Sequence, residues 1–76
     1  MNKNRRQYLK NAIDYLLKAK DIILKVKSEE EFTYDNIPEN LQYSTKGCDI
    51  EENIDSMEEI IDNIDDIVSE INDIIF

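Results

Sequence analysis

Apolar residues recur at spacings of three and four along the first part of the chain. Leu9, Leu16 and Ile23 mark one seven-residue period, and no Gly or Pro interrupts the stretch from residue 4 to about residue 30. Apolar positions at this period fall on one face of an α-helix. The sequence therefore predicts one long amphipathic helix over about residues 4–30.

A stricter heptad pattern covers about residues 49–75. Its apolar seam consists of Ile50, Ile54, Met57, Ile61, Ile64, Val68, Ile71 and Ile75. A seam that alternates steps of four and three is typical of a helix packed along another helix. This second helix is expected to begin with Asp49 as its N-cap, although Ser44 or Thr45 would also start it, one turn earlier.

Residues 31–48 form the connector between the two predicted helices, and they hold the chain's turn-forming residues. Pro38 excludes its predecessor from the α region and favours a short one-turn helix through Glu39 to Gln42. A connector of this length without packing would be unusual. Its apolar side chains are therefore expected to fold back over the open end of the hairpin as a hydrophobic cap, namely Phe32, Ile37, Leu41 and Tyr43.

The predicted fold is all-α, a long antiparallel two-helix hairpin that forms a single domain over residues 1–76. A chain of this length lies near the lower size at which enough surface is buried for independent folding. Ile60, Ile67 and Ile74 widen the apolar face of the second helix beyond what one neighbour needs. We therefore expect self-association to complete a helical bundle.

The first helix has an even broader apolar arc than the second. One antiparallel neighbour cannot cover this arc, and monomeric proteins seldom expose a contiguous patch of that kind. A further polypeptide is therefore expected to cover it, either a second copy of the chain or a foreign protein. The predicted apolar partner-binding residues are Tyr8, Tyr15, Leu17, Ile22 and Leu24.

Charge is distributed very unevenly along the chain, whose net charge is −9. Residues 1–28 carry eight Lys/Arg against two Asp, a net of +6, whereas residues 29–76 carry one Lys against sixteen acids, a net of −15. The carboxylates of the second helix fall opposite its apolar seam. Those expected to contact a partner are Glu52, Asp55, Glu59, Asp62, Asp66 and Asp73.

Two interpretations of this acidic face remain open. Its carboxylates are spaced along the helix much as phosphates are along a DNA strand, so the face is suited to occupy a basic nucleic-acid channel. The plainer interpretation is a solvated face whose field is largely neutralised by the basic first helix packed beside it. Surface ion pairs of that sort would select helix orientation more than they stabilise the fold.

The composition removes several classes of chemistry. The chain has no His, and Cys48 is its single Cys, which excludes His-dependent triads, Cys/His zinc sites and an internal disulfide network. Glu58 and Asp62 lie one turn apart as Mg²⁺ ligands would, but they fall on the solvated face. We therefore expect no enzyme activity, no cofactor and no metal site. Without an apolar signal segment or membrane span, a cytoplasmic location is expected.

The connector resembles one found in small acidic helical proteins from phages and prophages of Gram-positive bacteria. The matching positions are Glu30, Phe32, Asn36, Ile37, Pro38, Glu39, Leu41, Gln42 and Ser44. The resemblance implies a viral setting and hence the cytoplasm of a bacterial host. That family has no agreed activity, so the resemblance carries little chemistry with it.

These observations predict a non-catalytic protein-binding module. In the viral setting, it would be an accessory protein that binds and inhibits a host complex, such as a CRISPR-type defence system. Two alternatives stay open: a structural or regulatory homodimer without a foreign target, and an acidic protein that mimics nucleic acid. No direct contact with nucleic acid and no membrane association are expected.

Overall fold

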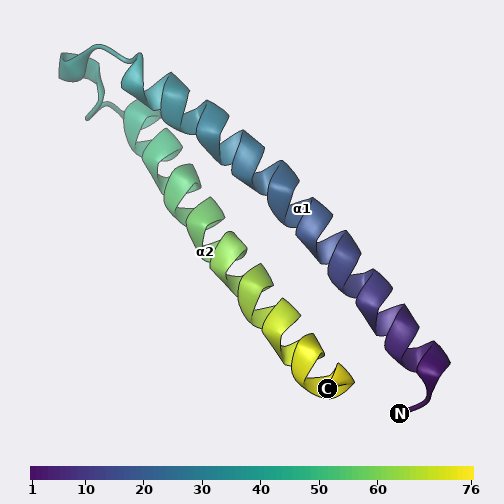
Figure 1. Ribbon diagram of the computed structural model, residues 1–76. Coiled ribbons are helices and arrows are strands. Elements are labelled where there is room, and N and C mark those ends of the chain that lie inside the picture. The colour runs from purple at the N-terminus through teal and green to yellow at the C-terminus, as the bar shows by residue number, and fades with distance from the viewer.

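The computed structural model describes all of residues 1–76 as two long helices joined by a short turn (Figure 1). Helix α1 spans Lys3–Asp35, the 3₁₀ helix η1 spans Glu39–Leu41, and helix α2 spans Thr45–Ile75. The two α-helices pack antiparallel and form a rod of 59 × 15 × 13 Å. The predicted all-α hairpin is confirmed, as is the one-turn helix after Pro38.

Side-chain caps define where both long helices begin. The Asn2 side chain accepts a 2.8 Å hydrogen bond from the Arg5 amide, and the Ser44 hydroxyl accepts a 3.4 Å bond from the Gly47 amide. Each cap satisfies one amide that has no partner inside its helix. Helix α2 therefore starts a turn before Asp49: Ser44, the alternative start that the sequence left open, is the N-cap, and Asp49 is not.

The seam between the helices is apolar on α2 and mixed on α1. The buried apolar residues of the chain all lie on α2, namely Ile50, Ile61, Ile64 and Ile75. Opposite them, α1 presents half-buried Leu9, Leu16 and Ile23, together with the half-buried chains of Lys20 and Lys27. The hairpin therefore buries one narrow stripe of α2, half-buries the facing stripe of α1 and leaves the rest of both surfaces open.

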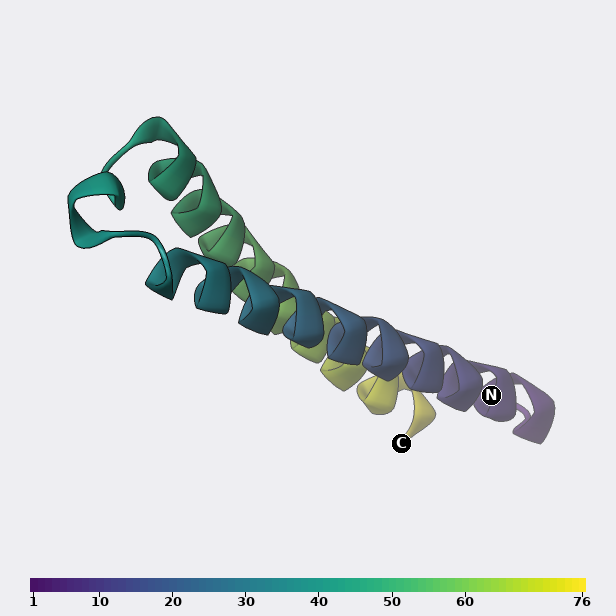
Figure 2. The ribbon, with the colours of Figure 1, turned by 90° about the horizontal axis from the view of Figure 1, so that it is seen from above.

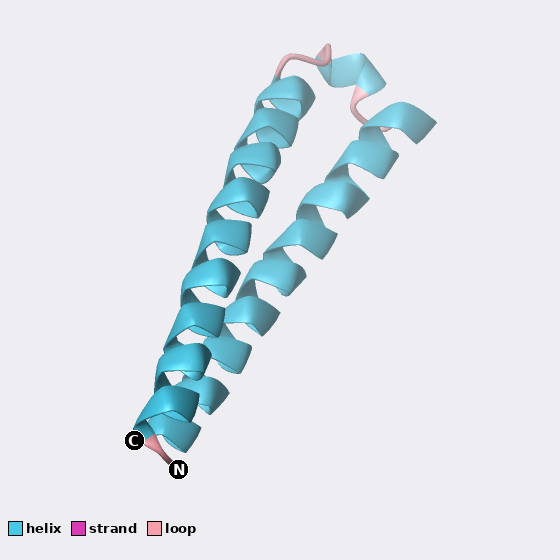
Figure 3. Ribbon diagram, turned by 90° about the vertical axis from the view of Figure 1, so that its right-hand side faces the viewer, coloured by secondary structure: helices cyan, strands magenta, loops and turns pink.

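The two helices cross at a shallow angle rather than running strictly parallel. In Figure 1 the ribbons diverge toward the termini, whereas in Figure 3 they diverge toward the connector, and Figure 2 shows the same crossing from above. Such a crossing is expected when a heptad seam is kept against a neighbouring helix, because the seam winds slowly around each helix axis.

Hydrogen bonds, rather than apolar packing, hold the connector. The side-chain amide of Gln42 donates to the carbonyl oxygens of Ile37 at 3.3 Å and of Tyr34 at 3.5 Å, and thereby caps the end of α1. Gly47 lies so close to this turn that a Cβ there would come within 2.1 Å of the Gln42 carbonyl oxygen. The turn and the start of α2 are consequently fixed against each other by backbone proximity.

The hydrophobic cap expected from the sequence does not form. The side chain of Ile37 is half-buried, but Phe32 is 72%, Leu41 49% and Tyr43 86% exposed. The physical reason is that α1 continues to Asp35, beyond its expected end near residue 30. The connector is therefore too short to fold back over the hairpin, and its backbone polar groups are satisfied locally.

Candidate protein-binding surface

Ion pairs between the helices identify one side of the hairpin, which we call the ion-pair flank. The Lys20 Nζ lies 2.6 Å from an Asp65 carboxylate oxygen, and the Lys27 Nζ lies 3.2 Å from Glu58 and 2.9 Å from Glu31. Asp65 and Glu58 are seven residues apart, so they lie on the same strip of α2. These contacts fix both the register of the two helices and the side on which their charged groups meet.

The opposite side of the hairpin is apolar, and we call it the apolar flank. A shallow groove of about 290 Å³ runs between the helices on this side, lined by Val26 and Glu30 of α1 and by Asn53, Ser56 and Met57 of α2. Seven residues are nearly two turns of a helix, so the residues spaced by seven from Val26 on α1 and from Asn53 on α2 lie on this same side. The apolar flank consists of Tyr8, Ala12, Tyr15, Ala19, Ile22 and Val26 on α1 and of Ile60, Ile67 and Ile74 on α2.

The large side chains of the apolar flank are open to solvent. Tyr8 and Tyr15 are each 71% exposed, Ile22 is 64% and Ile74 is 57% exposed. The strip crosses both helices and follows most of the rod. A contiguous apolar surface of this extent on a small protein marks a site of packing against another polypeptide. The exposed apolar residues and the extended shape thus indicate a protein partner or an oligomer.

The structure brings together three of the five predicted apolar partner-binding residues. Tyr8, Tyr15 and Ile22 lie on the apolar flank, whereas Leu17 and Leu24 lie on the ion-pair flank and are 41% and 38% exposed. In sequence all five belong to one wide arc. In the hairpin, α2 packs against the middle of that arc and divides it in two.

The isoleucine strip of α2 is the part of this surface that the predicted site residues omit. Ile60, Ile67 and Ile74 are 44%, 43% and 57% exposed beside the α1 strip. Their periodicity was visible in the sequence. Their position next to Ile22 and Val26 follows from the antiparallel pairing, because equivalent flanking positions of two antiparallel helices lie on the same side.

The predicted acidic partner-binding residues form a second surface, on the outer side of α2. All six are exposed, namely Glu52, Asp55, Glu59, Asp62, Asp66 and Asp73. None of them is in an ion pair, because the interhelical pairs use Glu58 and Asp65 instead. Direct ion pairing between the basic first helix and the acids of α2 is therefore limited to Lys20 and Lys27.

Two titratable groups at the seam have displaced pKa values. Hydrogen bonds to the Glu31 and Glu58 carboxylates raise the pKa of the Lys27 ammonium above its ordinary value of 10.5. Loss of hydration raises the pKa of the Tyr34 phenol above 10.0, and the nearby Glu51 carboxylate acts in the same direction. Both groups therefore keep their protons at neutral pH, Lys27 as a cation and Tyr34 as a neutral phenol.

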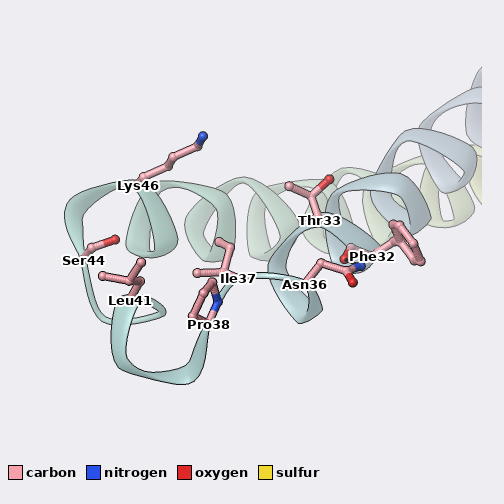
Figure 4. Close-up of a pocket in the computed structure, with 8 residues that line it drawn as sticks. All are labelled: Phe32, Thr33, Asn36, Ile37, Pro38, Leu41, Ser44 and Lys46. Carbon is pink, nitrogen blue, oxygen red and sulfur yellow. Dashed lines mark hydrogen bonds between the residues drawn. The ribbon is translucent and has the colours of Figure 1, made fainter.

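A second concave surface lies at the connector end of the rod. This groove of about 530 Å³ is lined by the residues drawn in Figure 4. The side chains of Ile37, Pro38 and Leu41 lie near one another, while Phe32 lies on the α1 side of the groove. The groove thus adds a partly apolar surface to the apolar flank and the acidic face already described.

The remaining observations bear on metal binding, membranes and related proteins. The acidic side chains are spread along the rod, and no three His, Cys, Asp or Glu groups come close enough together to hold a metal ion. Neither long helix combines the length and apolar character needed to cross a bilayer. No protein-family model, curated protein or solved structure matches this chain.

Proposed function

We propose that this chain is a non-catalytic protein-binding module whose apolar flank packs against a helical surface of another polypeptide. The observation that carries this proposal is the strip of exposed Tyr and Ile side chains that crosses both helices on one side of the hairpin. Burying each of these side chains contributes about 1.5–3 kcal/mol, so a partner that covers the whole strip gains enough free energy for specific binding.

In the biological setting we propose, the module is a phage-encoded accessory protein that binds a host complex and inhibits it, such as a CRISPR-type defence system. The connector sequence, with Asn36, Pro38 and Gln42 at the positions of the phage-type pattern, supports this setting. The structure gives two of those residues local roles, since the side-chain amides of Asn36 and Gln42 donate hydrogen bonds to the carbonyl oxygens of Phe32 and Tyr34 at the end of α1. Inhibition then follows from occupying a surface and requires no reaction.

A second candidate function is nucleic-acid mimicry by the acidic face of α2. What favours it is that Glu52, Glu59, Asp66 and Asp73 form one exposed outer strip and that none of them is in an ion pair with a Lys or Arg. A target with a basic channel would be attracted to this strip, and its binding would weaken steeply as salt is added. Reversing the charge of Glu59, Asp62 and Asp66 would abolish such binding and leave helicity intact.

The test of the main proposal compares matched variants of the two flanks. Tyr15→Ser with Ile22→Ser removes two apolar side chains from the apolar flank, and Leu17→Ser with Leu24→Ser removes two from the ion-pair flank. Affinity capture from the bacterial host, followed by mass spectrometry, should recover the same partner with the wild type and with the Leu17/Leu24 variant. The Tyr15/Ile22 variant should lose that partner.

Circular dichroism of both variants checks that the helices persist. The proposal is wrong if the Tyr15/Ile22 variant retains the partner at the wild-type level, or if both variants lose it equally. A tagged bait mixed with an untagged copy of the same chain extends the comparison to self-association, so a partner that is the protein itself is also detected.

A further inference from the structure

We infer that the occupant of the apolar flank is a second copy of this chain, in a two-fold arrangement with both connectors at the same end of the bundle. In this arrangement the two-fold axis runs along the rod, and α1 of each copy packs against α2 of the other. The inference rests on the proposed function, because it names the polypeptide that the protein-binding flank receives.

The charges bordering the apolar flank distinguish this arrangement from its alternative. On the α1 side the border carries Lys18 and Lys25, and the Lys18 Nζ lies 5.6 Å from the centroid of the Tyr15 ring on the flank. On the α2 side it carries Glu70 and, further toward the outer side of α2, Glu59 and Asp66 of the acidic face. With connectors at the same end, the basic border of each copy meets the acidic border of the other. With connectors at opposite ends, acidic border would meet acidic border.

The register of the hairpin makes this complementarity specific. The Lys20–Asp65 and Lys27–Glu58 pairs show that α1 and α2 advance residue for residue in opposite directions. Lys18 therefore lies within one residue of the level of Asp66, and Lys25 lies within one residue of the level of Glu59. A two-fold axis along the rod preserves these levels between copies, so each lysine reaches the level of a carboxylate on the second copy.

The sizes of the flank residues favour the same arrangement. By the same register, Ala19 of α1 lies within one residue of the level of Ile67 of α2, and Ala12 lies within one residue of the level of Ile74. When α1 packs against α2 of the second copy, each small Ala faces a large Ile, as in interdigitated packing. In the alternative arrangement α1 packs against α1 and α2 against α2. Ala would then face Ala in the first contact and Ile would face Ile in the second, so the two pairs of helices would lie at unequal distances.

The single Cys48 provides a native position for measuring the arrangement. It is exposed, and it lies near the connector on the outer side of α2, away from the apolar flank. A nitroxide attached there leaves the proposed interface intact. Double electron–electron resonance on the full-length wild-type chain then measures the distance between the two labels of a dimer.

With connectors at the same end, the label distance should be below roughly 30 Å, because neighbouring helices in a bundle are about 8–10 Å apart. With connectors at opposite ends, it should be roughly 40 Å or more, given a rise of 1.5 Å per residue between Cys48 and the far end of α2. A dimer with the long distance overturns the inference, and so does a protein that stays monomeric in sedimentation equilibrium.

A charge-reversal cycle tests the bordering pairs independently of any label. Lys18→Glu with Lys25→Glu should raise the dimer dissociation constant roughly tenfold or more, because each change acts twice in a symmetric dimer. Adding Glu59→Lys and Asp66→Lys should restore the wild-type value. Failure of the second pair to rescue the first contradicts the arrangement.

These outcomes separate failure of the inference from failure of the proposed function. A monomer that still captures a foreign protein through Tyr15 and Ile22 overturns only the identity of the occupant. A chain that neither dimerises nor depends on those residues for capture overturns both.

Discussion

The two flanks of the hairpin are made by the same two helices around the same seam, yet only one is completed within the chain. On the ion-pair flank, Lys20 and Lys27 are 26% and 21% exposed and reach carboxylates of α2. On the apolar flank, Tyr15 and Ile22 are 71% and 64% exposed and have no apolar surface of their own chain to cover them. The hairpin's interhelical ion pairs thus engage two lysines of α1, whereas its apolar flank is left exposed for another polypeptide.

The flank that forms ion pairs in the single chain offers less free energy than the apolar flank, which is left exposed. An exposed ion pair contributes about 0–1 kcal/mol, whereas burial of a large apolar side chain contributes about 1.5–3 kcal/mol. The ion pairs therefore mainly set register and orientation. The free energy available from association resides in the apolar flank, whose large side chains are exposed in the single chain.

Replacing the isoleucine strip should have the largest effect. Ile60→Gln, Ile67→Gln and Ile74→Gln together remove the α2 half of the apolar flank while retaining good helix formers. We expect more than a 100-fold increase in the dissociation constant for association, measured by sedimentation equilibrium. Glu58→Gln with Asp65→Asn on the other flank is the control and should change it by less than about tenfold.

Gly47→Ala tests how closely the start of α2 approaches the connector that holds the two helices together. Helix propensity alone would make Ala stabilising by about 1 kcal/mol. Because the added Cβ meets the Gln42 carbonyl at 2.1 Å, we instead expect destabilisation by about 1–3 kcal/mol in urea unfolding. Ser69→Ala, in an exposed position of α2, is the control and should be neutral or slightly stabilising. A stabilised Gly47 variant would contradict the close approach.

Neutralising the ion-pair flank should have a modest effect on the free energy of unfolding. Glu58→Gln or Asp65→Asn should each lower it by about 0–1 kcal/mol, because the carboxylate-bearing side chains are 55% and 49% exposed. The loss should shrink as salt is added, since salt screens exposed charges. A larger loss that salt does not reduce would show that these pairs stabilise the fold more than the apolar flank does.

Alkaline pH should produce the smallest effect. The pKa values of Lys27 and Tyr34 are raised in the folded protein, so the folded state holds these protons more tightly than the unfolded state. Their contribution to stability is complete below the ordinary values of 10.0 and 10.5 and is lost as pH rises through the raised values. Urea unfolding from about pH 9 upward should show this decline. Lys27→Met with Tyr34→Phe should reduce it, and an unchanged slope would contradict the assignment.

The sequence predicted α2 and the hairpin well, for a physical reason. The heptad from Ile50 to Ile75 is unbroken, and only a helix packed along another helix uses such a pattern. The end of α1 was harder to predict, because residues 29–31 are acidic and carry no apolar period. The Lys27–Glu31 ion pair lies in this stretch, and the half-buried Tyr34 extends the seam beyond it.

The site was only partly predictable. Exposure of Tyr8, Tyr15 and Ile22 followed from the width of the apolar arc on α1. That Leu17 and Leu24 belong to the other flank depends on which part of the arc faces α2, and this is set by the interhelical register. The apolar pattern of one helix shows how wide its apolar face is. How that face is divided into two flanks depends on where the neighbouring helix packs against it.

Hydroxyl-radical footprinting of the purified protein tests most directly the claim that a second chain covers the apolar flank. Tyr8 and Tyr15 report on the flank, and Tyr43, which is 86% exposed in the connector, is the internal control. We predict that Tyr8 and Tyr15 are protected relative to Tyr43 at high protein concentration and lose that protection on dilution. Equal labelling of all three tyrosines at every concentration would contradict the account.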